Sequence, residues 1–343
     1  MTSDQVTAPR MRNFRLRSTT LAPLAGIAVI LVLAAITTPT FYSPGVLRLV
    51  LFQIGVIGIV ALGQTVVLLL GGIDLSLSGV VSLTSVVLAT YTAGRNDALA
   101  VGVILCILAG LGVGMLNAGL VVLRSVPPFV ATFATFVLLQ GVIIAWTGGA
   151  PSGRIPEGLA WLGSGRVLQV PVPAVMFAVA ALLTGLILGK TTAGRRVYAT
   201  GLNSDAAMMS GIRVGLVTAS GYVIASLTGV LAGLVNAGFI GFVDAALVRD
   251  LDLNSIAAAV IGGIALSGGK GRIRQTALGV LLLALMLTWL IQLGAGGGAQ
   301  LVVSGAVILV AVWLQNSSLK VPFRRRMSSK NNARTATQLK GTP

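Results

Sequence analysis

Long apolar runs, separated by short polar stretches, extend along most of the chain. Each run approaches the roughly 20 residues that an α-helix needs to cross the hydrocarbon core of a bilayer. The breaks between the runs contain Gly, Pro and charged residues, which end helices. The eighth run is short and glycine-rich, so we expect a broken or partial span there. The pattern predicts ten spans, at residues 21–38, 49–70, 78–94, 98–121, 128–147, 171–189, 214–238, 253–268, 275–294 and 299–316.

The composition excludes a soluble globular protein. Of the 343 residues, 55% are apolar and only 9% are charged, whereas soluble domains carry about 25% charged residues. Cys106 has no partner for a disulfide, and without histidine the chain has no histidine catalysis or histidine metal ligation. We predict no catalytic residue, metal site or bound cofactor. The predicted fold class is an all-α polytopic membrane protein, with a cytosolic segment at 1–20, a transmembrane domain at 21–316 and a basic, disordered cytosolic tail at 317–343.

The basic residues predict the orientation in the membrane. With a cytosolic N-terminus and ten spans, 5 of the 24 Lys and Arg residues lie outside and the other 19 inside. This excess is expected of cytosolic loops, so both termini should face the cytosol of the inner membrane. Because the basic residues follow the ends of apolar runs, the net charge of +16 does not indicate nucleic-acid binding. Five acidic residues should lie outside or at the outer edge: Asp97, Glu157, Asp244, Asp250 and Asp252.

Asp74 lies between two apolar spans, within the glycine-rich segment 71–79. A carboxylate at the bilayer centre costs about 3 kcal/mol on insertion scales, so it must be solvated, capped or functional. We favour a cap, in which the carboxylate accepts backbone N–H groups at the start of the next helix. A role in a permeation path or gate is the alternative, and proton coupling is less favoured. The candidates for a path suited to a hydroxylated solute are Gln64, Asp74, Ser76, Asn117 and Asn254.

The inward loop at about 190–213 is predicted to contain a short helix. Asn203 or Ser204 can cap it, and Gly211 can end it. Such a helix suits docking into a groove of a partner, although an ordinary connecting loop is an equal alternative. Residues 185–191 are one residue short of a phosphate-binding loop, so energy from ATP would have to enter through a partner.

Glycines mark further features of the predicted helices. Gly110 with Gly114, and Gly229 with Gly233, have the spacing of close helix packing. Residues 262–267 match 71–76 at five of six positions, with Ala265 in place of Asp74. The two segments would have the same orientation, so they are not mates of an inverted repeat.

Three blocks of the sequence carry a family pattern. They are Gly63–Thr65 continuing to Gly71–Ser76; Gly194–Gly211; and Ile256–Ala258 continuing to Gly262–Gly263 and Leu266–Arg272. In their order and spacing, the blocks resemble the permease subunit of bacterial ABC importers of the ribose/xylose/arabinose type. The resemblance covers roughly residues 45–315, and the Arg124–Phe129 segment with Asn117 also fits. The chain departs from the family at Asp252-Leu253-Asn254, where Glu-Leu-Asp is usual, at Ala193, usually aromatic, and at Met208, usually Arg.

The resemblance implies a vitamin-importer-like (type II) ABC permease fold and a sugar-conducting function. It also implies a cytosolic ABC ATPase that uses ATP and Mg, a periplasmic sugar-binding protein, and a second permease copy, identical or paralogous. Alternative solutes are autoinducer-like or nucleoside-like polyols. An ion-coupled secondary transporter is less favoured, because only Asp74 is expected within the membrane. The residues implied to engage the ATPase are Gly194, Arg195, Gly201, Asn203, Ala206, Ala207, Ser210 and Gly211.

Overall fold

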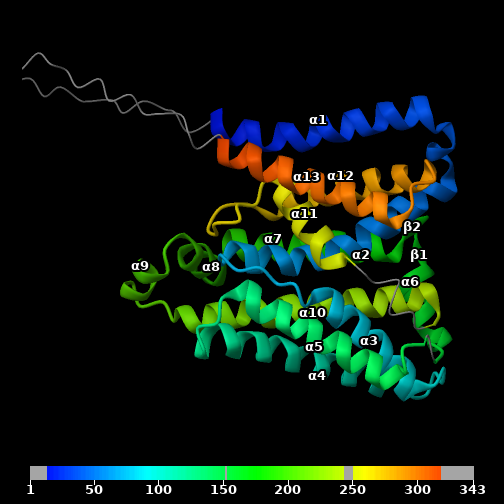
Figure 1. Ribbon diagram of the computed structural model, residues 1–343, viewed down its shortest axis with the longest axis horizontal. Helices are drawn as coiled ribbons and strands as arrows, with labels where there is room; N and C mark the ends of the chain where they lie inside the picture. The colour runs from blue at the N-terminus through cyan, green and yellow to red at the C-terminus, as the bar shows by residue number, and fades with distance from the viewer. Residues whose placement is uncertain (1–13, 151–152, 243–249, 318–343) are drawn as a thin grey trace, which may run out of the picture.

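The computed structural model describes residues 14–150, 153–242 and 250–317, and it is a bundle of long helices lying side by side (Figure 1). The predicted tail at 317–343 lies almost wholly outside the described residues, as does most of the segment at 1–20. The long helices are α1 (Phe14–Thr37), α2 (Pro44–Leu69), α4 (Leu99–Ala118), α5 (Pro128–Thr147), α7 (Val172–Lys190), α10 (Val214–Ile240), α12 (Ile273–Gln292) and α13 (Gly297–Ser317).

Each of the ten predicted ranges contains one apolar helix. Among the described residues, six helices are long and apolar enough to cross a membrane. The apolar stretches of the other four, in α1, α3, α11 and α13, are shorter. The polytopic helical class is therefore confirmed. The eighth range was predicted too long, because α11 (Leu251–Gly262) ends at Gly262. Gly263 and Gly268 have positive φ angles of 107° and 81°, a conformation that glycine allows and a helix does not.

Helices α2 and α10 form the centre of the bundle. Every residue of α2 from Gly55 to Leu69 is buried, and α10 packs against α2, α3 and α4. A Cβ atom at Gly110 would overlap Val230 of α10, and one at Gly233 would lie 2.7 Å from Thr84 of α3. The predicted role of the glycine pairs in helix packing is confirmed.

Two short helices begin inside the bundle. Helix α3 (Leu77–Thr92) has 16 residues and α11 has 12. At 1.5 Å per residue they measure about 24 Å and 18 Å, less than the roughly 30 Å of a hydrocarbon core. A non-helical stretch, residues 71–76, leads from α2 into α3. Irregular backbone of this kind is tolerated at membrane depth only when protein or a water-filled cavity surrounds it.

The two ends of the bundle differ. At one end, α8 (Thr192–Leu202) and α9 (Ser204–Met209) project, and α1 begins and α13 ends at the same end (Figure 1). The opposite end has α6 (Ala160–Ser164) and an antiparallel hairpin of β1 (Arg166–Val167) and β2 (Val170–Pro171). The remaining elements are η1 (Pro39–Tyr42), the π-helical continuation of α4 labelled η2 (Gly119–Leu123), and η3 (Glu157–Leu159).

Candidate functional site

A polar cluster at the entry to α3 contains four of the five predicted path residues. Asp74 Oδ1 accepts hydrogen bonds from Ser76 N at 2.8 Å and Ser76 Oγ at 2.6 Å. Asn117 Nδ2 donates to Ser76 Oγ at 2.8 Å. With its amide oriented to satisfy both atoms, Gln64 donates to the Asp74 carbonyl at 2.9 Å and accepts from the Asp74 N–H at 3.3 Å. All four residues have 0% exposure, so the cluster is sealed inside the bundle.

Asp74 does not cap α3 in the strict sense. Its carboxylate accepts the N–H of Ser76, which is the N-cap residue of α3 and itself makes no side-chain cap hydrogen bond. The carboxylate still lies near the N-terminal end of α3, where the helix dipole favours a negative charge. Thr132 of α5 holds the same segment: its hydroxyl accepts from Leu75 N and donates to the Ile73 carbonyl, both at 3.1 Å. Asp74 Oδ2 has no hydrogen-bond partner among the described residues.

Asn254 lies apart from this cluster. Its side-chain oxygen accepts from Ser304 Oγ at 3.4 Å, which ties α11 to α13. The sequence analysis named Asn254 with Asp74 as a path candidate, but no hydrogen bond joins Asn254 to the Asp74 cluster among the described residues.

Asp250 and Asp252 are not at the outer edge, and that prediction was wrong for both. They line a cavity shared with Phe136 and Gln140, which lie near the middle of α5. Asp252 is 8% exposed in the first turn of α11 and lies close enough to Asp74 for their charges to repel. The physical reason is the shortness of α11, whose first residue lies well inside the bundle. Among the described residues, three carboxylates rather than one therefore lie within the bundle.

Helix α9 has the predicted boundaries. Asn203 Oδ1 accepts from Ala206 N at 3.0 Å, and Gly211, at φ +78°, follows the last turn. The chain reverses there through a hydrogen bond from Ile212 N to the Ala207 carbonyl at 3.1 Å. Met209 is 90% exposed. The tip of α9 therefore presents a flexible apolar side chain away from the bundle, as a docking element requires.

The three blocks that carry the family resemblance meet at one backbone junction. The Leu69 carbonyl at the end of α2 accepts from Gly269 N at 2.8 Å. A Cβ atom at Gly201 of α8 would overlap that same carbonyl oxygen, and one at Gly268 would lie 2.9 Å from Gly71 N. Helix α8 thus contacts the end of α2, from which the segment leading to Asp74 continues, and the segment that follows α11.

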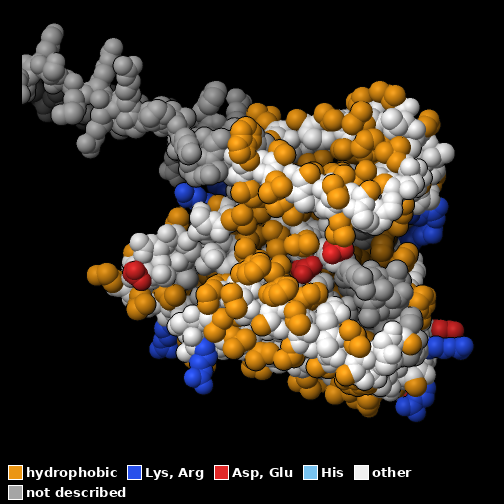
Figure 2. Space-filling model, viewed as in Figure 1, with side chains coloured by type: hydrophobic (Ala, Val, Ile, Leu, Met, Phe, Trp, Pro, Cys, Tyr) orange, Lys and Arg blue, Asp and Glu red, His pale blue; other side chains and the backbone are white. Residues whose placement is uncertain are grey.

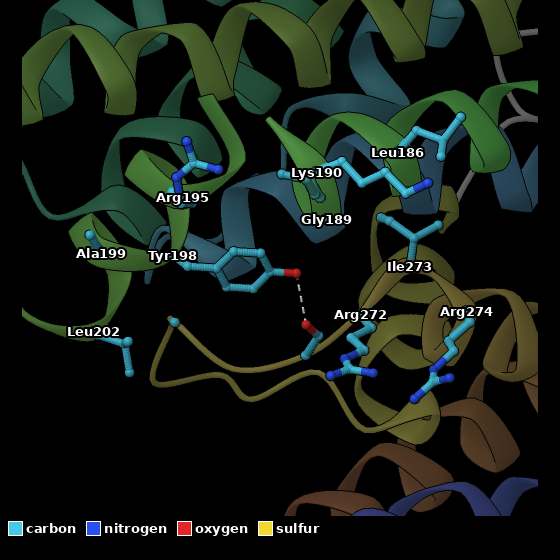
Figure 3. Close-up of a pocket in the computed structure, with 14 residues that line it drawn as sticks. Leu186, Gly189, Lys190, Arg195, Tyr198, Ala199, Leu202, Arg272, Ile273 and Arg274 are labelled. Carbon is cyan, nitrogen blue, oxygen red and sulfur yellow. Dashed lines mark hydrogen bonds between the residues drawn. The ribbon is translucent and has the colours of Figure 1, made fainter. Parts of the chain in front are cut away.

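A basic cavity of about 900 Å³ lies beside α8 (Figure 3). The Tyr198 hydroxyl donates to the Gly271 carbonyl at 2.9 Å across it. Burial raises the pKa of Tyr198, and Arg272 acts in the opposite direction, so the phenol stays protonated as the donor. No acidic residue is among the described residues that line the cavity. Its cations are Lys190, Arg195, Arg272 and Arg274.

The chain was compared with known protein families and with curated proteins. Residues 46–312 match the model of a family described as the permease component of branched-chain amino acid transport systems. The chain belongs to this permease family. A ribose import permease of Bacillus subtilis is 36% identical over 296 residues, which cover 86% of this permease and 92% of that relative.

Two further relatives extend this similarity. A ribose import permease of Escherichia coli K12 is 33% identical over 84% of the permease and 92% of the relative. An autoinducer 2 import permease of Salmonella paratyphi B is 30% identical over 91% of the permease and 89% of the relative. No solved structure matches the permease.

Sequence reasoning missed α8 and the basic cavity of the permease. A signal for α8 was present, because Thr191 caps it by accepting from Gly194 N at 3.3 Å, a spacing visible in the sequence. The cavity had no such signal, since its cations come from segments about 80 residues apart along the chain.

Proposed function

We infer that this permease is the membrane subunit of an ATP-driven importer that conducts a pentose- or hexose-like sugar from the periplasm to the cytosol. The observation that carries the inference is the similarity to two ribose import permeases, each matched over 92% of its length. The Asp74 cluster is fully buried, so we assign it to holding the entry of α3 in place rather than to contact with the solute.

The proposed membrane arrangement has ten spans in a vitamin-importer-like fold, with both termini in the cytosol. Six long helices and four shorter apolar ones supply the spans. Helices α3 and α11 would each cross only part of the membrane. The non-helical segments at 71–76 and 263–272 would complete these two spans. The start of α1 and the end of α13 lie at the α8–α9 end (Figure 1), which supports a common side for both termini. The 19 to 5 distribution of basic residues supports the cytosol as that side.

The proposed coupling element is the loop from Gly194 to Gly211. A cytosolic ABC ATPase, using ATP and Mg, would bind α9 and the basic surface beside α8. Because Gly201 contacts both the Leu69 carbonyl and Gly269, a displacement of α8 would be transmitted to the segments that lead to Asp74 and α11. The other proposed partners are a periplasmic sugar-binding protein and a second permease copy, identical or paralogous, within the lipid bilayer. The permease itself would bind no cofactor.

A second candidate solute is an autoinducer-like polyol, supported by the 30% identity to an autoinducer 2 permease. The ion-coupled alternative needs a direct test as well, since Asp74, Asp250 and Asp252 all lie within the bundle.

Reconstitution would test the proposed function. The permease, its ATPase and its binding protein, placed in proteoliposomes, should accumulate D-ribose only when ATP and Mg are supplied. The matched control omits the ATPase and imposes a proton or sodium gradient. Accumulation driven by that gradient would contradict the ATP-driven assignment and favour a secondary transporter.

A further inference from the structure

A cavity of about 430 Å³ opens where α5 meets the starts of α3 and α11. Phe133, Phe136 and Gln140 line it from α5, and Leu75 lines it from the segment before α3. Its remaining lining residues are Asp250, Asp252 and Leu253. Acidic side chains are visible in the middle of an otherwise largely apolar face of the molecule (Figure 2).

The fold does not require a carboxylate at Asp250. The residue precedes α11 with a left-handed φ of 70°, and its side chain caps nothing. It is partly exposed, and no described cation forms a salt bridge with it or with Asp252. An ionised side chain at this depth is costly against lipid, so the open side of the cavity must face water or polypeptide.

The two carboxylates of the cavity differ in their surroundings. Ser78 in the first turn of α3 is 2% exposed, and its hydroxyl lies beside the Asp252 carboxylate, to which it can donate. We therefore expect Asp250, rather than Asp252, to be the carboxylate available to a solute in the cavity.

We propose that this cavity is a transit binding site for a neutral polyhydroxylated solute, with Asp250 as its principal polar contact. The inference rests on the proposed function and locates the solute within it. Carboxylate oxygens accept hydrogen bonds from sugar hydroxyls, and the Gln140 amide can both donate and accept. The rings of Phe133 and Phe136 offer apolar surface to the C–H groups of a sugar. Two carboxylates, with no cation among the described residues that line the cavity, would repel phosphorylated sugars.

Site-directed labelling can test the site directly. Leu253→Cys, in the Cys106→Ser background, would report on the cavity in permease–ATPase complexes reconstituted in lipid. We expect a water-soluble thiol reagent to react there and D-ribose to slow the reaction, whereas ribose 5-phosphate should not. Leu138→Cys, exposed on the same α5 but outside the cavity, should react slowly because it faces lipid. Asp97→Cys, in the loop between α3 and α4, should react at a rate that ribose leaves unchanged.

The contact residues are tested in the same reporter background. Asp250→Asn keeps the size of the side chain and removes the charge, so about tenfold more ribose should be needed for protection, the scale of one hydrogen bond to a charged group. Gln140→Leu provides a second variant, which removes the amide. Thermal stability in detergent is measured for both variants, to show that each is folded. Protection that is unaltered in both folded variants would overturn the proposal.

Two outcomes separate this inference from the proposed function. If the unmodified complex accumulates ribose with ATP but ribose never protects Leu253→Cys, the site is wrong and the function stands. If L-leucine protects Leu253→Cys and ribose does not, the cavity belongs to an amine-bearing solute, which overturns the polyol site.

Discussion

Asn117 and Ser76 are joined by a hydrogen bond of 2.8 Å that connects the end of α4 to the segment entering α3. The Ser76 hydroxyl accepts this bond and donates its own proton to Asp74 Oδ1 at 2.6 Å. A chain of three buried side chains therefore runs from one helix to the carboxylate of the next. Each link is costly to break, because an unpaired buried polar group loses about 1–3 kcal/mol.

Replacement of Asp74 separates its role as a hydrogen-bond acceptor from a functional role of its charge. Asp74→Leu leaves the Ser76 N–H and hydroxyl without their acceptor, so we expect a loss of about 1–3 kcal/mol in stability and little permease in the membrane. Asp74→Asn keeps an acceptor and should be tolerated better, since the Asn side-chain oxygen also accepts a backbone N–H. Thermal stability and uptake per amount of permease are measured together. Loss of uptake by a stable Asp74→Asn protein would indicate that the charge itself takes part in transport.

The turn after α9 requires a left-handed residue at Gly211, where φ is +78°. Gly211→Val should cost about 1–2 kcal/mol locally and disorder the end of α9. We expect normal insertion, weaker binding of the ATPase and loss of uptake, while the binding protein still captures sugar. Gly211→Asn is the matched control, because Asn adopts this conformation readily. Equal ATPase binding by both variants would exclude α9 as the docking element.

The contact between α8 and the end of α2 requires glycine at position 201, because a Cβ atom there would overlap the Leu69 carbonyl oxygen. Gly201→Ala would place a methyl group against the Leu69 carbonyl oxygen, so α8 must move away. We expect ATP hydrolysis in the reconstituted complex to continue while uptake falls several-fold. Gly189→Ala, near the end of α7, introduces the same methyl group where nothing lies within 4 Å and should change neither rate. Full uptake by Gly201→Ala would disprove the proposed coupling route.

Two glycines of α4 provide a paired test of helix packing. A Cβ atom at Gly110 would overlap Val230, whereas one at Gly112 would meet nothing within 4 Å. Ser226 Oγ also donates to the Gly110 carbonyl at 2.6 Å. Gly110→Val should lower stability by about 1–3 kcal/mol through overpacking, and Gly112→Val should not. Melting temperatures in detergent compare the two, and equal values would contradict the packing of α4 on α10.

The proposed orientation predicts which single cysteines react from outside the cell. Cys106 is buried and its thiol donates to the Thr84 carbonyl at 3.4 Å, so serine can keep this hydrogen bond while it removes the reactive group. Arg95→Cys and Arg154→Cys should be labelled in intact cells, and Met209→Cys only after permeabilisation. Position 325, outside the described residues, should behave like 209. Thr200 is a poor reporter because it is 5% exposed. Labelling of position 325 in intact cells would contradict the ten-span arrangement.

The sequence by itself determined the fold class, the positions of ten apolar helices and the boundaries of α9. These features depend on local physical chemistry: the length of an apolar run, the capping by Asn203 and the left-handed turn at Gly211. The hydrogen bond from Ser76 N to the Asp74 carboxylate is local too, since the two residues are two positions apart. The packing glycines of α4 and α10 were also visible as a spacing.

Tertiary structure alone decided what gathers around Asp74. Asn117 is 41 residues from Ser76 along the chain, and no local pattern predicts their hydrogen bond. The same holds for Asp252, whose place inside the bundle depends on how far α11 extends, and for Gly201, whose neighbours come from two other segments. Hydropathy reports where a helix crosses apolar surroundings but not at what depth a short helix begins. For α11 that depth is set by packing against α12, α2 and α13, and it determines which carboxylates line the cavity.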